Sequence, residues 1–131
     1  MQPFLKWQLL AFQPESSTVS EVDAATEGKE DEWLRCLDCR TQVTSEKHRI
    51  AVSGSHDHRF FNPSGVVFHI GCFGEAIHLL TGSPPSDEFT WFPGALWQVA
   101  LCANCTKHLG WFFQTNSGGT FWGLILNRLT K

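Results

Sequence analysis

Short apolar runs separated by turn-forming clusters dominate the chain from Trp33 onward. The clusters, each rich in Gly, Pro, Ser or Asn, occur at residues 53–55, 62–65, 82–86, 93–94 and 116–119. Runs of this length between such clusters are typical of strands joined by tight turns. The pattern therefore predicts a mainly β domain built from antiparallel strands.

One stretch departs from the strand pattern. Between Gly74 and Leu80, the apolar residues Ala76, Ile77 and Leu80 have helical spacing. This spacing predicts one or two helical turns. The expected fold class remains mainly β with little helix.

The chain divides near Trp33. Residues 1–32 carry seven acidic residues against two lysines, and residues 13–32 are polar and poor in large apolar side chains. Such a segment buries too little apolar surface to order itself. We expect residues 1–32 to be an acidic, flexible N-terminal segment and residues 33–131 to be one ligand-binding domain, since 131 residues suit a single domain.

Charge and hydropathy exclude several function classes. Residues 33–131 carry eight basic against six acidic residues and have no dense Lys/Arg cluster, so nucleic-acid binding is not expected. No stretch approaches the roughly 20 apolar residues of a membrane span. The first residues are interrupted by Pro3, Lys6 and Gln8 and lack a secretory cleavage pattern. We expect a cytoplasmic protein without membrane partners.

Four of the five cysteines form two CxxC pairs. Cys36 and Cys39 make the first pair, Cys102 and Cys105 make the second, and 62 residues separate the pairs. Two such pairs supply the four thiolates of a tetrahedral zinc site. The pattern predicts one structural Zn²⁺, although two local redox pairs remain an alternative. Cys72 stands alone and is expected to be a small buried hydrophobe.

Three tryptophans surround the second pair. Trp111 and Phe113 share one face of a strand, while Phe112 points to the other face. Trp97 shares a face with Val99 in the preceding strand. Between Trp91 and Trp97, Pro93–Gly94 indicates a type II turn that folds one indole toward the other. The indoles therefore either line one cavity or simply form the core, and the pattern alone leaves both interpretations open.

Other candidates for chemistry are weaker. His56, His58 and His69 are possible metal ligands, but histidines in a Ser/Gly loop are usually solvated. Asp87 and Glu88 precede the tryptophan cluster and either face solvent or add negative potential to a cage. No Ser-His-Asp set or phosphate-binding glycine loop can be argued from the spacing.

The region from Phe89 to Cys105 resembles the thalidomide-binding CULT domain of the cereblon family. The matching residues continue through His108-Leu109-Gly110-Trp111-Phe112-Phe113 and Phe121-Trp122-Gly123-Leu124. Together with Cys36, Cys39 and Asn62-Pro63, they cover residues 33–130 in order and approximate spacing. The chain is similar to the single-domain cereblon-like proteins of bacteria, and no ubiquitin-ligase adaptor domain is expected.

The resemblance implies two antiparallel sheets that meet at a steep angle, in a tent-like arrangement with zinc on the four cysteines. It also implies a pocket in which the main chain near Phe89 and Trp91 holds an imide. By position, the ligand-binding residues are Asn62, Pro63, Phe89, Thr90, Trp91, Trp97, Trp111 and Phe113.

The chain departs from animal cereblon at the rim of this pocket. Phe89 stands where the animal proteins have a histidine, and Ser64 and Val66 replace a histidine and a tyrosine. The contact at Phe89 is made through the backbone in the family, so imide binding should survive. Contacts outside the imide ring should differ.

The resemblance implies a protein that binds cyclic imides without turning them over. The implied ligands are a glutarimide of the thalidomide type, a uracil or uridine, or a cyclic imide at a modified protein C-terminus. Three alternatives stay open: an aromatic cage for methylated ammonium groups, a plain zinc-stabilised interaction module, and an enzyme like B-type methionine sulfoxide reductase. The enzyme would need Cys72 as its nucleophile, because no cysteine follows Cys105.

Overall fold

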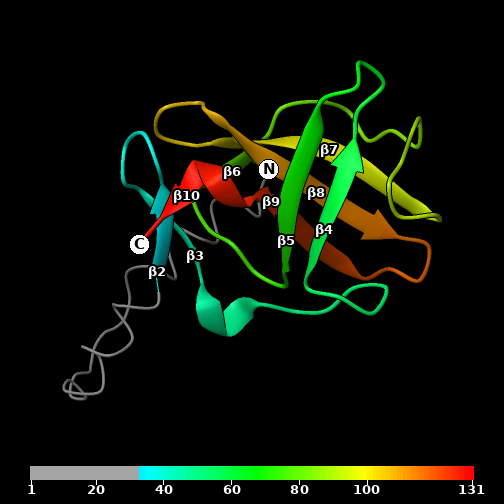
Figure 1. Cartoon of the computed structure of the whole chain (residues 1–131), viewed down its shortest axis with the longest axis horizontal. Helices are drawn as coiled ribbons and strands as arrows, with labels where there is room; N and C mark the ends of the chain where they lie inside the picture. The colour runs from blue at the N-terminus through cyan, green and yellow to red at the C-terminus, as the bar shows by residue number, and fades with distance from the viewer. Residues whose placement is uncertain (1–32) are drawn as a thin grey trace.

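The structure, a computed structural model, describes residues 33–131 as two antiparallel sheets (Figure 1). The expected mainly β fold class is confirmed. The predicted N-terminal segment, residues 1–32, lies outside the described residues. Within the described part of the chain, no helix is long and apolar enough to cross a membrane.

The smaller sheet has three strands in the order β10-β2-β3. Strand β2 (Trp33–Cys36) lies between β3 (Gln42–Ser45) and the two-residue strand β10 (Leu129–Thr130). The first and last strands of the described chain are therefore neighbours, which joins the two ends of the domain.

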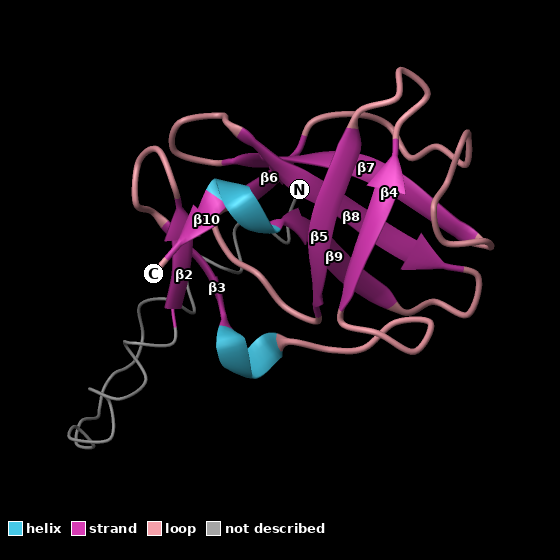
Figure 2. Cartoon of the chain, in the orientation of Figure 1, coloured by secondary structure: helices cyan, strands magenta, loops and turns pink. Residues whose placement is uncertain are grey.

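The larger sheet has six strands in the order β4-β5-β9-β8-β7-β6. Its members are β4 (Asp57–Phe61), β5 (Val67–Phe73), β6 (Leu79–Thr81), β7 (Ala95–Cys102), β8 (His108–Thr115) and β9 (Thr120–Ile125). Two short 3-10 turns, η2 (Glu46–His48) and η3 (Leu126–Arg128), are the only helical segments of residues 33–131 (Figure 2).

The larger sheet has an apolar layer on each face. One layer packs toward the smaller sheet and includes Leu34, Val43, Phe73 and Leu124. The other includes Ile70, Phe92, Trp111, Phe113 and Phe121. A register shift between Ala100 and Leu101 of β7 lies opposite the start of β8. This β-bulge lets Leu109 belong to the first layer although Trp111 and Phe113 belong to the second.

The prediction of one or two helical turns between Gly74 and Leu80 is wrong. This segment is irregular and ends in strand β6. Its backbone groups are bonded to other elements: Ile77 N–H donates to Val43 O (2.7 Å), and Glu75 O accepts from the Thr44 hydroxyl (2.6 Å). His78 has a φ of 60°, which is incompatible with a right-handed helix. Tertiary hydrogen bonds override the local spacing.

Gly110 of β8 lies against the backbone of β9 with no room for a side chain. A Cβ atom at this position would lie 2.8 Å from the Leu124 Cα and even closer to the Gly123 carbonyl oxygen. We expect Gly110→Ala to destabilise the fold by about 2 kcal/mol or more, because backbone must move to admit the methyl group. Thermal denaturation measures this loss. Gly74→Ala is the control, since its Cβ would meet only Ile50 Cγ2 at 3.5 Å, and an equal loss in both variants would contradict the explanation.

Candidate functional site

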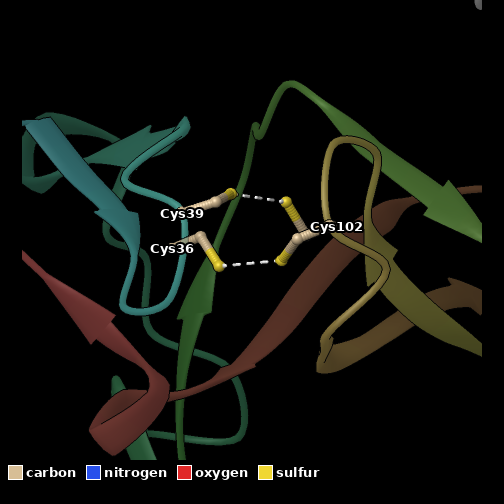
Figure 3. A group of neighbouring side chains, drawn as sticks. Cys36, Cys39 and Cys102 are labelled. Atoms are coloured by element: carbon tan, nitrogen blue, oxygen red, sulfur yellow. Dashed lines mark hydrogen bonds between the residues drawn. The ribbon is translucent and has the colours of Figure 1, made fainter.

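The two CxxC pairs meet between the sheets. Cys36 ends strand β2 of the smaller sheet, and Cys102 ends strand β7 of the larger one. The Sγ atoms of Cys36 and Cys105 are 3.6 Å apart, as are those of Cys39 and Cys102 (Figure 3). All four Sγ atoms lie within 4.8 Å of one another.

These distances suit a shared metal ion better than disulfides. Four sulfurs at about 2.3 Å from one zinc ion form a tetrahedron whose edges are about 3.8 Å, close to the observed spacing. A disulfide would require about 2.05 Å between sulfurs. All five cysteines of the described chain are free thiols. The predicted metal ligands therefore come together as a possible metal site with a complete S4 shell.

The two pairs have matching backbone geometry. Arg40 N–H donates to Cys36 O and Thr106 N–H donates to Cys102 O, both at 2.8 Å. Arg40 and Thr106, which directly follow the second cysteine of each pair, have φ values of 66° and 65°. This tight turn points both thiols of a pair in one direction.

Hydrogen bonds favour the thiolate of Cys39, whereas burial raises the pKa of Cys102 and raises that of Cys105 to about 12. The Thr41 hydroxyl lies 3.1 Å from Cys39 Sγ and lowers the pKa of that thiol to about 6. Asn104 N–H donates to Cys102 Sγ at 3.4 Å. An ion pair between Lys107 Nζ and Asp38 (3.3 Å) links the two turns. A cation bound among the four sulfurs would favour the deprotonated form of Cys102 and Cys105, which burial alone disfavours.

A cavity of about 440 Å³ lies on the other apolar layer of the larger sheet. The walls are mostly aromatic. The lining residues are Asn62, Pro63, Phe68, Glu88, Phe89, Trp91, Trp97, Val99, His108, Trp111 and Phe113. The structure thus brings together seven of the eight residues expected to bind ligand, although ligand contact itself stays a prediction.

Thr90 is the expected residue that does not line the cavity. Its hydroxyl instead donates to Phe92 O at 3.3 Å, within the turn that follows. Ala95 N–H closes this turn on Phe92 O (2.9 Å), and Gly94 has a φ of 85°. The turn predicted from Pro93–Gly94 is therefore present and carries the chain from Trp91 back to Trp97.

Two of the indoles are fixed through their N–H groups. Trp91 Nε1 donates to Phe61 O at 3.0 Å, and Trp97 Nε1 donates to Glu88 O at 2.8 Å. Because these donors are occupied, both rings offer the cavity apolar surface. Trp91 also meets Trp111 edge to face, with ring centroids 4.7 Å apart.

Trp111 and Phe113 form the most buried part of the wall. Trp111 is 8% exposed and Phe113 is 1% exposed. Phe112 lies on the opposite face of β8, where its ring packs against Trp122 at 4.6 Å between centroids. The alternation expected along this strand is confirmed. The two interpretations of the tryptophans are therefore compatible, because Trp111 serves both core and cavity.

The segment between Ser86 and Trp91 forms the rim. Ser86 and Trp97 exchange two backbone hydrogen bonds, each within 3.0 Å. Phe89 is 71% exposed and has a φ of 55°, which is rare for a bulky side chain. Such strain is often kept at binding sites because it presents backbone groups.

The hydrogen bonds of the Asn62 side-chain amide, at the cavity mouth, show which of its atoms is the oxygen. Its Oδ1 atom accepts hydrogen bonds from Ser64 N–H (3.0 Å) and Val66 N–H (2.9 Å). Both partners are donors, so the bonded atom is the oxygen and Nδ2 remains available as a donor.

Sequence reasoning did not single out Phe68, Val99 and His108 as parts of the lining, whereas Glu88 was a candidate and does line the cavity. His108 Nε2 donates to Gly110 O at 2.9 Å, and its ring meets Trp111 edge to face. Burial lowers the pKa of His108, so the ring is neutral at neutral pH. His108 and Val99 lie within the residues that resemble the CULT domain, so the resemblance could have pointed to them as lining residues. Phe68 lies in another strand, and no sequence feature pointed to it as a lining residue.

The remaining candidates have structural roles. His58 Nε2 lies 3.0 Å from both Val52 O and Ser55 O, and His69 Nε2 lies 2.8 Å from Asp57 Oδ2. Among residues 33–131, the cysteine group is the only cluster suited to a metal. Cys72 is fully buried, as expected, and this burial raises its pKa to about 12.

Comparison with known proteins gives one consistent result. The chain is similar to protein cereblon from Gallus gallus (31% identity over 102 residues) and from Danio rerio (32% over 102 residues), each covering 73% of the chain. Protein cereblon from Xenopus tropicalis is 36% identical over 98 residues, or 72% of the chain. The chain spans only 22–24% of the length of these relatives. No protein-family model matches.

Proposed function

Because this chain contains a cereblon-like CULT domain, we propose that it is a receptor that binds cyclic imides in its aromatic cavity. The imide would be held between Trp91, Trp97, Trp111 and Phe113 and released unchanged. The cavity is the observation that carries this proposal: its aromatic walls suit a flat ring, and its indole donors at Trp91 and Trp97 are already occupied.

Backbone groups of the rim supply the polar contacts. Within residues 33–131, the Phe89 carbonyl and the Trp91 N–H have no hydrogen-bond partner. A cyclic imide presents an N–H between two carbonyls. The Phe89 carbonyl would accept from the imide N–H, and the Trp91 N–H would donate to one imide oxygen. A bound ligand would cover both backbone groups. The two hydrogen bonds to the imide would then prevent the free-energy cost of a buried polar group without a partner.

The expected affinity is modest. A glutarimide has about eight heavy atoms, and roughly 1 kcal/mol for each gives a Kd on the order of micromolar. Glutarimides of the thalidomide type, uracil or uridine, and cyclic imides at modified protein C-termini all present this array. The cavity volume of about 440 Å³ leaves room for a group attached to the ring.

The cysteine site would hold one structural Zn²⁺. Its four sulfurs complete a tetrahedral shell and leave no position for a substrate or water, which is the arrangement of structural zinc sites. The metal would fix the relative position of β2 and β7, and with them the two sheets.

A cage for methylated ammonium groups is the second candidate. Glu88 lines the cavity and would supply the negative charge that supports cation binding. Competition between trimethyl-lysine and a glutarimide distinguishes the two functions. Displacement of the imide by trimethyl-lysine at a lower concentration than by free glutarimide would favour the cage.

The burial of Cys72 supports binding without conversion. A nucleophilic cysteine needs an accessible thiol with a lowered pKa, whereas Cys72 is buried and its pKa is raised to about 12. A plain interaction module is the remaining alternative, and it predicts that no cyclic imide affects the cavity.

Titration of the protein with thalidomide and with uracil tests the proposal. Of the five tryptophans in residues 33–131, three line the cavity, so intrinsic fluorescence should change in a saturable way. Succinimide, a smaller ring with the same N–H, serves as a size control and should bind more weakly. If none of these compounds changes the tryptophan fluorescence, the plain interaction module would be favoured.

Removal of residues 1–30 should leave imide affinity unchanged. Among residues 33–131, those that line the cavity lie between Asn62 and Phe113. Comparison of the full chain with a protein that begins at Asp31 measures the effect. A loss of more than about tenfold, or roughly 1.4 kcal/mol, would instead mean that the N-terminal segment contacts the ligand.

A further inference from the structure

A permanent positive charge lies behind one wall of the aromatic cavity. Arg128, a half-buried residue of η3, places its guanidinium carbon over the Phe68 ring, 5.8 Å from the ring centroid. Its Nη1 atom donates to His108 O at 2.9 Å. Phe68 and His108 both line the cavity. Arg128 is therefore one side chain away from a bound ligand.

Nearby charges do not cancel that of Arg128. Within residues 33–131, no carboxylate forms an ion pair with Arg128. Glu88, the one acidic residue that lines the cavity in the described part of the chain, is exposed on the rim. Water and salt screen an exposed charge more than a half-buried one. Neutral His108 adds no second charge. The wall formed by Phe68 and His108 therefore has a net positive potential.

We propose that Arg128 sets the charge preference of the cavity, so that neutral and anionic ligands are admitted and organic cations are disfavoured. This inference rests on the proposed imide binding and names a specificity-determining residue of that site. Aromatic faces by themselves attract cations. A fixed guanidinium behind them opposes this attraction and would separate an imide receptor from an ammonium cage that has the same tryptophans.

The expected size of the effect follows from the separation of the charges. Two unit charges about 10 Å apart in an effective dielectric of about 20 alter binding by on the order of tenfold. An uncharged imide feels little of this field, so removal of Arg128 should act on charged ligands alone.

A matched pair of ligands tests the proposal on the full chain. One is a glutarimide that carries a trimethylammonium group on a ring carbon, and the other is its uncharged tert-butyl counterpart. Wild-type protein should bind the uncharged compound about tenfold more tightly. In Arg128→Gln this preference should shrink to less than about threefold, with the affinity for the uncharged compound retained. An unchanged preference in Arg128→Gln would overturn the proposal.

Two further variants test whether the ligand preference depends on the position of the charge. The alternatives are an effect of the protein's net charge and an effect on folding. Arg35→Gln removes the same charge from strand β2 of the smaller sheet and should keep the wild-type preference. An equal shift in Arg35→Gln would overturn the proposal. Arg128→Lys should keep the preference. If Arg128→Gln does not fold, the wild-type preference must still weaken as salt rises from about 20 mM to about 500 mM, and a salt-independent preference would overturn the proposal.

Failure of imide binding can be told apart from failure of the charge preference. If neither glutarimide binds, the proposed function is wrong. Collisional quenching of tryptophan fluorescence by iodide and by caesium still reports the potential at the cavity without any ligand. Iodide should quench more than caesium in the wild type, and the difference should fall in Arg128→Gln. Equal iodide-to-caesium ratios in the two proteins would overturn the charge preference.

Discussion

Cys102→Ser should abolish the folded state of the domain under conditions in which the wild type is stable. Structural zinc contributes on the order of 10 kcal/mol to small zinc domains, which rivals the whole stability of a typical domain. Cys102 is fully buried at the end of β7, and its thiol is one of two that join the larger sheet to the smaller one. Loss of this ligand would weaken the connection that a bound metal makes between β2 and β7.

Elemental analysis and thermal denaturation measure this effect. The wild type should contain one zinc per chain, and a strong chelator should reproduce the loss caused by Cys102→Ser. Cys72→Ala is the matched control, because Cys72 is equally buried but lies outside the metal group. It should retain zinc and lose only about 1 kcal/mol. A Cys102→Ser protein with an unchanged melting temperature, or a folded wild type without metal, would refute the structural zinc site.

Trp97→Ala should weaken imide binding by about 2 to 4 kcal/mol, as expected for an aromatic hot spot at the centre of an interface. The indole acts in two ways. Its ring forms a cavity wall, and its N–H holds Glu88 O at 2.8 Å, next to the strained backbone of Phe89. Truncation therefore removes apolar surface and releases the rim that presents the polar groups.

Calorimetric or fluorescence titration measures the loss, provided that each variant is shown to be folded. Phe112→Ala is the control, because that ring packs against Trp122 on the opposite face of β8. It should cost folding stability but leave imide affinity within about threefold. Trp97→Phe separates the two roles of the indole, since it keeps an aromatic wall and loses the N–H. Similar losses in Trp97→Ala and Phe112→Ala would mean that the effect is on folding alone.

Methylation of the imide nitrogen is a complementary change on the ligand. It removes the donor that would meet the Phe89 carbonyl and places bulk against that carbonyl. The loss should be comparable to that of Trp97→Ala. Equal binding of parent and N-methylated imide would show that the cavity recognises shape alone, and the ammonium cage would then become the better hypothesis.

Several features of this protein were predictable from the sequence because they depend on residues that are close together in the chain. The CxxC spacing limits how two thiols can be arranged, so the grouping of Cys36, Cys39, Cys102 and Cys105 into a possible metal site was predictable. The Pro93–Gly94 turn was predictable for the same reason, because proline and glycine restrict the backbone at their own positions. Strand alternation correctly separated Trp111 and Phe113 from Phe112.

Only the tertiary structure decided the features that depend on distant partners. Gly74–Leu80 has helical spacing but is not helical, because its backbone bonds to Val43 and Thr44 in another sheet. Phe68 enters the cavity wall through the pairing of β5 with β9, which no local pattern predicts. The fixed orientations of Trp91 and Trp97 likewise depend on carbonyls at Phe61 and Glu88. The sequence by itself determined which four cysteines make up the possible metal site and which face of β8 carries Trp111 and Phe113. Long-range backbone pairing decided which of those faces enclose a cavity, because sequence patterns record the conformation of one segment and not its neighbours in space.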